Sequence, residues 1–420
     1  MEIQISGLGA SGEGVGKLDN YTIFVEGALP GETVNIDLVT QKKTYGKGKL
    51  LEVITPSPNR VQPPCPVFGR CGGCQLQHLG YSSQLDVKRQ KVIDALERIG
   101  QLKGVAVSPC QPSPLEYHYR NKIQLPVVGE KIGMYEKGSH RLVEIDHCLI
   151  HSELGEEAYQ EIKRAFYHKN IRHLLIRSAI STNEVLVILV CSSKPSQEHY
   201  KMAENLIKNH PTIKGVVANI NTRADNVILG KTYIPLCGRP FINETQLGLT
   251  FKISPASFFQ VNPMQAEHLY QCVIEFASLS GKEKVLDAYC GVGTLALHLS
   301  KMALSVTGVE CIPEAIEDAK LNAKENGIEN CRFVCGDAAN AEGSYDVVVV
   351  NPPRKGCDEK LLDTLVRQKP QKIIYVSCNP ATLARDLKKL TEEYRVVSVK
   401  PFDMFPQTAH VETVVLLEYA

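Results

Sequence analysis

The sequence lacks three features that would narrow its function at once: an excess of one charge, a long apolar run and a secretion signal. Its 47 basic and 46 acidic residues leave a net charge of +1, which neither favours nor excludes a nucleic-acid partner. No stretch approaches the length of a membrane span. Residues 1–16 contain no basic segment followed by an apolar run, so we expect no signal peptide, no membrane partner and a cytoplasmic location.

A disulfide framework is not expected either, although the chain contains 14 cysteines. A long chain of cytosolic character keeps its thiols reduced, so cysteines with regular spacing point to a metal or to catalysis. The scattered cysteines are expected to be small core residues: Cys110, Cys191, Cys237, Cys272, Cys331 and Cys335. A length of 420 residues predicts two or three domains.

The N-terminal region alternates glycine-rich turns with short β-patterned runs, which predicts a small β-barrel over residues 1–57. Four lysines lie close together at one edge of this barrel: Lys42, Lys43, Lys47 and Lys49. On composition alone they are a solvated strand face. Prolines then mark a linker, at positions 56, 58, 63 and 64.

The remainder of the chain divides into a mixed region and a regular one. A helix is expected over 76–100, and residues 109–240 mix β-patterned runs with helices near 152–168 and 197–209. From residue 241 onward strands and helices alternate, which predicts an α/β fold, a Rossmann-like doubly wound parallel sheet. The expected helices of this part cover 294–303, 313–326, 358–368 and 381–393.

We therefore expect three domains. Residues 1–57 form the barrel, and 58–75 together with 109–240 form a central α+β domain. Residues 76–108 and 241–420 form the domain with the doubly wound sheet.

A glycine-rich turn follows the first strand of that sheet, in Val285-Leu-Asp-Ala-Tyr-Cys-Gly-Val-Gly-Thr294. Glycine lets a ligand approach the backbone closely, and no lysine offers a phosphate cradle. Glu310 ends the next strand, where a carboxylate can bind both hydroxyls of a ribose, and Asp337 follows the third strand within reach of an adenine amino group. Ordinary turns between strands and helices are the alternative, but the three elements in order resemble the S-adenosylmethionine site of Rossmann-like methyltransferases.

The fourth strand ends in Asn351-Pro-Pro-Arg354, which resembles methyltransferases that act on a planar base. Enzymes that methylate exocyclic amines place an aromatic residue after the prolines, to stack on the flipped base. Arg354 stands at that position, which counts against amine chemistry.

A single cysteine, Cys378, ends the apolar strand 373–376. Asn379 is a good helix cap and Pro380 suits the first helical turn, so Cys378 lies where a helix N-terminus stabilises a thiolate. A buried structural cysteine is the alternative. A thiolate that adds to C6 of uracil makes C5 nucleophilic toward a sulfonium methyl group, and a base must then remove the C5 proton. Glu412, in His410-Val-Glu-Thr413, is our candidate for that base.

Four motifs together resemble the RNA uracil-5-methyltransferase family over nearly the whole chain: Ser257-Phe-Phe-Gln-Val-Asn262, Asn351-Pro-Pro-Arg354, Ser377-Cys-Asn-Pro380 and His410-Val-Glu-Thr413. The resemblance implies that Cys378 is the nucleophile and Glu412 the base. It also implies a set of residues around the cofactor S-adenosylmethionine: Gln260, Tyr289, Gly291, Glu310, Asp337 and Asn351. Many members carry Asp where this chain has Asn351, and a neutral amide can bind the uracil edge but cannot act as a base.

A second group of cysteines consists of Cys65, Cys71, Cys74 and the distant Cys148. The spacing favours a metal over free thiols, and it suits an iron–sulfur cluster as well as zinc. The resemblance implies a [4Fe–4S] cluster, which ribosomal RNA members carry and bacterial tRNA-directed members typically lack. We expect a structural role, since the proposed chemistry contains no redox step.

The barrel resembles the TRAM module of RNA-modifying enzymes, which turns its lysines into candidate phosphate contacts. Candidates for stacking on a splayed base are Phe258, Phe259 and His147. The expected substrate is a uridine in 23S ribosomal RNA, and the expected state is a monomer. The alternatives are a tRNA uridine methyltransferase, an RNA cytosine-5 methyltransferase, which typically has Pro where Ser377 stands, and a non-catalytic iron–sulfur RNA-binding protein.

Overall fold

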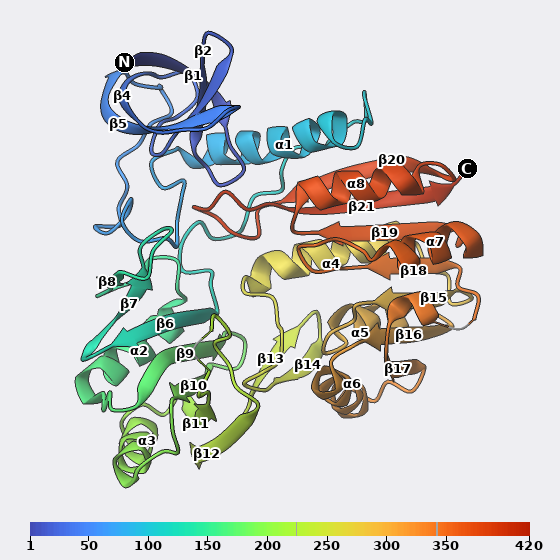
Figure 1. The fold of residues 1–420 in the computed structure, drawn as a ribbon. Helices are drawn as coiled ribbons and strands as arrows, with labels where there is room; N and C mark the ends of the chain where they lie inside the picture. Colours follow the sequence, from blue (N-terminus) through green and yellow to red (C-terminus); the bar gives the residue numbers. More distant parts are fainter. Residues whose placement is uncertain (224, 342) are drawn as a thin grey trace.

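The computed structural model describes residues 1–223, 225–341 and 343–420. The chain begins in a closed barrel, at the top left of Figure 1, whose strands follow the order β1-β2-β3-β5-β4. Their inward side chains form a small core of their own, built around Ile5, Ile23 and Ile36. The strands are β1 (Glu2–Leu8), β2 (Gly14–Leu18), β3 (Tyr21–Val25), β4 (Thr33–Gln41) and β5 (Tyr45–Thr55). The predicted barrel is confirmed.

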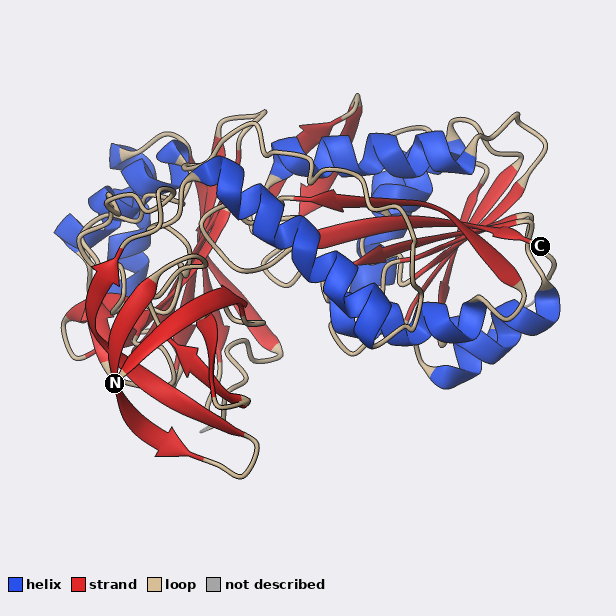
Figure 2. Ribbon diagram, turned by 90° about the horizontal axis from the view of Figure 1, so that it is seen from above, coloured by secondary structure: helices blue, strands red, loops and turns tan. Residues whose placement is uncertain are grey.

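A long helix, α1 (Tyr81–Arg98), follows the barrel and packs on the C-terminal part of the chain. Figure 2 shows α1 running from the barrel side of the molecule across to the far sheet. Its buried residues recur on one face: Gln84, Lys88, Val92 and Leu96. The first two are polar, which places hydrogen-bonding groups inside the interface.

The central sheet contains seven strands in the order β12-β11-β10-β9-β6-β7-β8. Helices α2 (Glu153–Ala165) and α3 (Gln197–Asn209) cover one face. They coincide with the two helices predicted near 152–168 and 197–209. The other face packs on the C-terminal part through Leu175, Ile188 and Val190. The strands are β6 (Lys122–Val128), β7 (Lys131–Tyr135), β8 (Leu142–Glu144), β9 (Ile171–Ala179), β10 (Glu184–Cys191), β11 (Ile213–Ile220) and β12 (Thr232–Gly238). A separate hairpin follows, β13 (Ile242–Gln246) and β14 (Leu249–Ile253).

The C-terminal sheet also contains seven strands, in the order β17-β16-β15-β18-β19-β21-β20. The five strands on one side are parallel, but the last two pair antiparallel with their neighbours. The predicted parallel sheet is thus extended by two antiparallel strands at this edge, where a loop and no crossover helix joins β20 to β21. The strands are β15 (Lys284–Ala288), β16 (Ser305–Glu310), β17 (Cys331–Cys335), β18 (Val347–Val350), β19 (Lys372–Ser377), β20 (Tyr394–Phe402) and β21 (Glu412–Tyr419).

Helices cover both faces of this sheet, which confirms the predicted α/β class. One face carries α4 (Pro263–Ala277), α5 (Thr294–Ser300) and α6 (Pro313–Glu325). The other carries α1 with α7 (Glu359–Gln368) and α8 (Pro380–Leu390), and a short 3-10 helix spans Ala338–Asn340. None of the described helices has the length and the apolar character that a membrane crossing needs.

Candidate active site

The candidate residues gather along one edge of the C-terminal sheet. The parallel strands β15, β16, β18 and β19 all end at this edge, while β21 begins there because it runs the opposite way. Ser377, the last residue of β19, pairs with Thr413, so Cys378, which follows β19, and Glu412, the first residue of β21, are neighbours. Residues 34 positions apart in the sequence are thus brought together by one antiparallel pairing.

Cys378 lies just before α8, whose cap is Asn379. The Asn379 side chain accepts a hydrogen bond from the Ala381 N–H and donates one to the Arg354 carbonyl oxygen, which ties this turn to the end of β18. Burial and the nearby Glu412 carboxylate raise the pKa of Cys378 to about 11, and the Arg354 guanidinium opposes that rise. The thiol is therefore protonated at neutral pH in the free protein.

Glu412 is 4% exposed, and burial raises the pKa of its carboxyl to about 8. Arg354 is the one group that opposes this rise. A carboxyl group with a pKa near neutrality can both hold and release a proton, which is what a general base in a dry site requires. Arg354 lowers the pKa of both Cys378 and Glu412. The sequence indicated only that Arg354 counts against amine chemistry.

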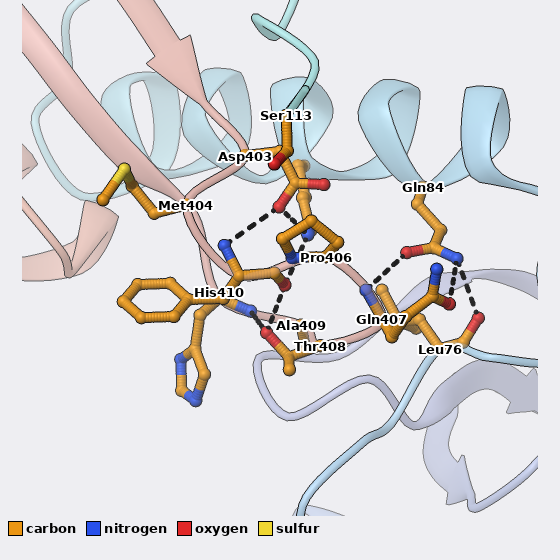
Figure 3. Close-up of polar contacts among 12 residues, drawn as sticks. Leu76, Gln84, Ser113, Asp403, Met404, Pro406, Gln407, Thr408, Ala409 and His410 are labelled. Atoms are coloured by element: carbon orange, nitrogen blue, oxygen red, sulfur yellow. Dashed lines mark hydrogen bonds and ion pairs between the residues drawn. The ribbon is translucent and has the colours of Figure 1, made fainter. Parts of the chain in front are cut away.

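The loop between β20 and β21 carries His410, which lines the same cavity as Arg354; Figure 3 shows the polar contacts of this loop. Gln84 of α1 donates to the Gln407 side chain and accepts from the Gln407 N–H, both across the interface with α1. Lys88 forms a buried ion pair with Asp403 at 2.6 Å and also donates to the Phe405 carbonyl oxygen. These contacts fix the loop that precedes Glu412.

No sequence signal pointed to this support. Helical spacing marks Gln84 and Lys88 as members of one face, but a pattern within α1 carries no information about partners more than 300 residues away.

Burial, Arg354 and the two lysines of α1 lower the pKa of His410 to about 4, so its imidazole is neutral.

The glycine-rich turn after β15 is shaped to receive a ligand. Gly291 has φ +55, and a Cβ there would meet no atom within 4 Å, so the backbone is open to an incoming group. Gly293 is different: with φ +83, a Cβ would lie 2.9 Å from the Phe333 ring. One glycine therefore leaves space for a ligand, and the other allows close packing.

Glu310 ends β16 beside this turn. Its carboxylate accepts hydrogen bonds from the N–H groups of Gly291, Cys311 and Ile312. Tyr289 precedes Gly291 with a left-handed φ of +68. Asp337 caps the 3-10 helix through the Ala339 N–H. This edge therefore presents a fixed carboxylate, an aromatic ring and open backbone, which suit a nucleoside.

Two other predicted residues also lie near this edge. The Asn351 N–H donates to the Ala288 carbonyl oxygen at 3.4 Å, which places Asn351 at the end of β18. Gln260 is buried, and its carbonyl oxygen accepts from the Asn121 side chain. Phe258 is 67% exposed, whereas Phe259 is 5% exposed and packs in the core, which favours Phe258 over Phe259 among the stacking candidates.

The four cysteines of the second group line one cavity of about 310 Å³: Cys65, Cys71, Cys74 and Cys148. The same cavity is lined by His147, Arg354 and His410, so it adjoins the site at Cys378. Burial raises the pKa of Cys74 to about 12, and the neighbouring thiols add to the rise. Among the described residues, no three His, Cys, Asp or Glu side chains are grouped so that they could hold a metal ion.

The remaining cysteines and the barrel lysines are placed as follows. Cys110, Cys191 and Cys272 are buried, as expected of core residues, but Cys335 is exposed at the end of β17, so that expectation is wrong. The four barrel lysines are exposed.

Comparison with known proteins identifies three matching regions. Residues 338–420 match the family described as tRNA (Uracil-5-)-methyltransferase, 285–368 match a methyltransferase domain and 1–51 match a TRAM domain. An "uncharacterized RNA methyltransferase" of Clostridium tetani is 44% identical over 99% of this chain and 96% of its own length. A relative of the same description from Halalkalibacterium halodurans is 43% identical over 100% and 96%.

One solved structure matches the whole chain. It is the Pyrococcus abyssi tRNA (uracil-54, C5)-methyltransferase in complex with S-adenosyl-L-homocysteine, with a TM-score of 0.82 and 31% identity. The match covers 99% of this chain and 100% of that one.

Proposed function

Because this chain belongs to the RNA uracil-5-methyltransferase family, we propose that it transfers a methyl group to C5 of a uridine in 23S ribosomal RNA, with Cys378 as nucleophile and Glu412 as base. The observation that carries the proposal is the adjacency of Cys378 and Glu412 at the sheet edge, with Arg354 acting on both. A lone buried cysteine would need neither partner.

The first step asks Cys378 to form a bond from its sulfur to C6 of the uracil. The C5–C6 π electrons then move toward C5 and the carbonyl oxygen at C4. The high pKa of Cys378 in the free protein means that its thiol proton must pass to solvent as the uracil binds, and Arg354 favours the resulting thiolate by hydrogen bond and charge. S-adenosylmethionine, when bound, supplies the electrophilic methyl group that C5 attacks.

The second half of the reaction belongs to Glu412. After methylation C5 carries both a methyl group and a proton, and the carboxylate removes that proton. The C–H electrons re-form the C5–C6 double bond and expel the Cys378 thiolate. A pKa near 8 makes Glu412 a stronger base than an exposed carboxylate, and its burial keeps water away from the adduct.

The open backbone at Gly291 would receive the cofactor's nucleoside, with Glu310 binding the ribose hydroxyls and Asp337 the adenine. Tyr289 and Gln260 would border the same space. Asn351 is assigned to the uracil edge, where its amide can donate and accept hydrogen bonds.

We also propose that the four cysteines hold a [4Fe–4S] cluster with a structural role. Tetrahedral zinc, with Zn–S bonds of about 2.3 Å, brings thiolates within about 3.8 Å of one another. The four thiols line one common cavity, which supports a shared centre, and the family resemblance favours iron–sulfur over zinc. Anaerobic purification with iron and zinc analysis tests this, and stoichiometric zinc without iron would overturn it.

Ribosomal RNA is favoured over tRNA because the resemblance associates the cysteine set with ribosomal RNA members. A tRNA uridine is the second candidate, favoured by the whole-chain likeness to the Pyrococcus abyssi enzyme, which acts on tRNA. We place the enzyme in the cytoplasm as a monomer.

The deciding experiment maps 5-methyluridine in 23S ribosomal RNA and in tRNA from cells with and without the gene. Loss of one or more ribosomal sites, restored by the wild-type gene but not by Cys378→Ala, is the expected result. Loss confined to tRNA would assign the second candidate instead.

A further inference from the structure

Two positive side chains stand directly opposite each other on the central sheet. Lys122 of β6 and Arg177 of β9 are partners in the antiparallel pairing of these strands. The next pair, Ile123 and Ile176, points into the core beneath α2 and α3. Because side chains alternate along a strand, Lys122 and Arg177 point to the opposite face, toward the C-terminal part of the chain. Like charges in this arrangement destabilise a sheet.

Within residues 1–223, 225–341 and 343–420, no carboxylate compensates this pair. Arg177 is 4% exposed, its Nη2 donates to the Ser257 carbonyl oxygen, and its Nε has no acceptor among the described residues. Burial lowers the pKa of Arg177 to about 10, with only Tyr233 opposing. A buried guanidinium with an unused N–H is costly, and a negative charge nearby would reduce that cost.

Lys122 is only partly buried, but it too has no counter-charge among the described residues. Its Nζ makes no hydrogen bond or ion pair with any described residue. Burial lowers its pKa to about 7, and the charges of Arg177 and Arg120 add to the decrease. Arg120 lies two residues earlier and its Nε donates to the Lys122 carbonyl oxygen. Three cations therefore share one side of the sheet.

This group borders the candidate active site. Arg177 holds the carbonyl of Ser257, and the Asn121 side chain holds that of Gln260, so the segment between them is fixed from the central sheet. Phe258, which is 67% exposed, lies in that segment. Arg120 lines the cavity that also contains Arg354 and His410.

We propose that Lys122, Arg177 and Arg120 form a binding site for one backbone phosphate of the substrate RNA, next to the nucleotide that enters the active site. The proposal rests on the RNA methyltransferase function above. A phosphate oxygen would accept from the Lys122 Nζ and the Arg120 guanidinium, and its negative charge would offset the repulsion between Lys122 and the buried Arg177. A permanent ion pair at this place would need a carboxylate of the protein. In this proposal the RNA phosphate supplies the negative charge instead.

The site makes an unusual prediction for the protein without RNA. Replacing Lys122 by methionine keeps most of the aliphatic stem but removes one of two opposed charges. Lys122→Met should therefore raise the melting temperature of the free protein while it weakens RNA binding. A purely structural lysine would do the reverse, because its loss would lower stability.

The test uses the full-length protein and the RNA segment that carries the mapped 5-methyluridine, whether that segment is ribosomal or transfer RNA. Failure of the 23S assignment thus changes the probe and leaves this test intact. We expect about tenfold weaker binding by Lys122→Met. The slope of log K against log salt should fall by about 0.7, the value for one phosphate contact on a single strand.

A neutral methylphosphonate placed at each phosphate around the target uridine locates the contact. At one position the methylphosphonate should weaken RNA binding by the wild-type protein by about the same factor as Lys122→Met does. At that position it should not weaken RNA binding by the Lys122→Met variant any further. Lys131→Met is the matched control, since Lys131 lies on neighbouring β7 with 67% of its side chain exposed. It should bind like the wild type, and both variants should bind S-adenosylhomocysteine normally.

Three results would overturn the proposal. They are unchanged affinity and salt slope in Lys122→Met, a methylphosphonate effect that persists in full in the variant at every position, and a lowered melting temperature of the free variant with normal RNA binding.

Discussion

Lys88 and Asp403 form an ion pair of 2.6 Å in which both side chains are buried, with exposures of 1% and 0%. The two residues join helix α1 to the loop that leads into Glu412. Asp403 also accepts from the Phe405 N–H, so its carboxylate organises the loop as well as binding the lysine. The sheet edge that carries the candidate active site is therefore supported by a helix that lies far from it in the sequence.

Removing the lysine alone should be severe. Lys88→Met leaves Asp403 buried without its charge partner, which costs about 3–5 kcal/mol of unfolding free energy. Denaturant unfolding measures this loss, and methylation should fall with it because the loop before Glu412 loosens. The double variant Lys88→Met, Asp403→Leu removes both charges and should regain most of the stability. The exposed pair of Lys369 and Glu393 serves as control, since Lys369→Met should barely change stability.

This ion pair also shows how far the sequence could predict the structure. The turn from β19 into α8 was predictable because Asn379 and Pro380 are local signals, and the structure has the cap where they place it. Helix α4 begins with the same kind of signal, Asn262 followed by Pro263, yet it was not predicted. Its residues lie on a largely buried helix, so no clear polar face marked the period.

The parts that could not be predicted depend on contacts between distant residues. The chemistry at Cys378 and Glu412 followed from residue types and from the family likeness. The antiparallel course of β21, which brings the two together, has no local signature. Likewise, Phe258 and Phe259 are adjacent and identical in type, and only packing decides that one is exposed and the other buried.

The roles proposed for Cys378 and Glu412 make different predictions for trapped RNA. Cys378→Ala should form no covalent adduct, because no other group can add to C6. Glu412→Gln should accumulate the adduct already methylated at C5, since addition and methyl transfer precede proton removal. Denaturing gels with radiolabelled methyl groups separate these cases. Normal turnover by Glu412→Gln would show that another group is the base.

Stability should depend on pH through Glu412. Its pKa is 4.5 in the unfolded chain and about 8 in the folded protein. Between these values the folded state binds the proton more tightly, so the wild type loses stability as pH rises from about 5 to 8. Glu412→Gln carries no such penalty.

The variant and the wild type should therefore melt together near pH 5 and diverge above it, with the variant higher by on the order of 5 °C at pH 8.5. Scanning calorimetry over this pH range provides the measurement. Glu418→Gln, at the far end of the same strand, should follow the wild type throughout. If the melting temperatures of Glu412→Gln and the wild type changed in parallel with pH, the pKa of Glu412 would not be raised in the folded protein.

Because the backbone at Gly291 is open, a substitution there should weaken cofactor binding much more than it lowers the stability of the protein. Gly291 and Gly327 have similar φ values, +55 and +65, and in both cases a Cβ would meet no atom within 4 Å. Alanine should therefore cost about 1 kcal/mol of unfolding free energy at either position, from the left-handed conformation alone. Gly327 follows helix α6, away from the cofactor-binding edge. If the nucleoside lies against Gly291, Gly291→Ala should weaken S-adenosylhomocysteine binding by at least about tenfold, and Gly327→Ala should leave it unchanged. Calorimetric titration of both variants makes the comparison, and equal affinities would place the cofactor elsewhere on the sheet edge.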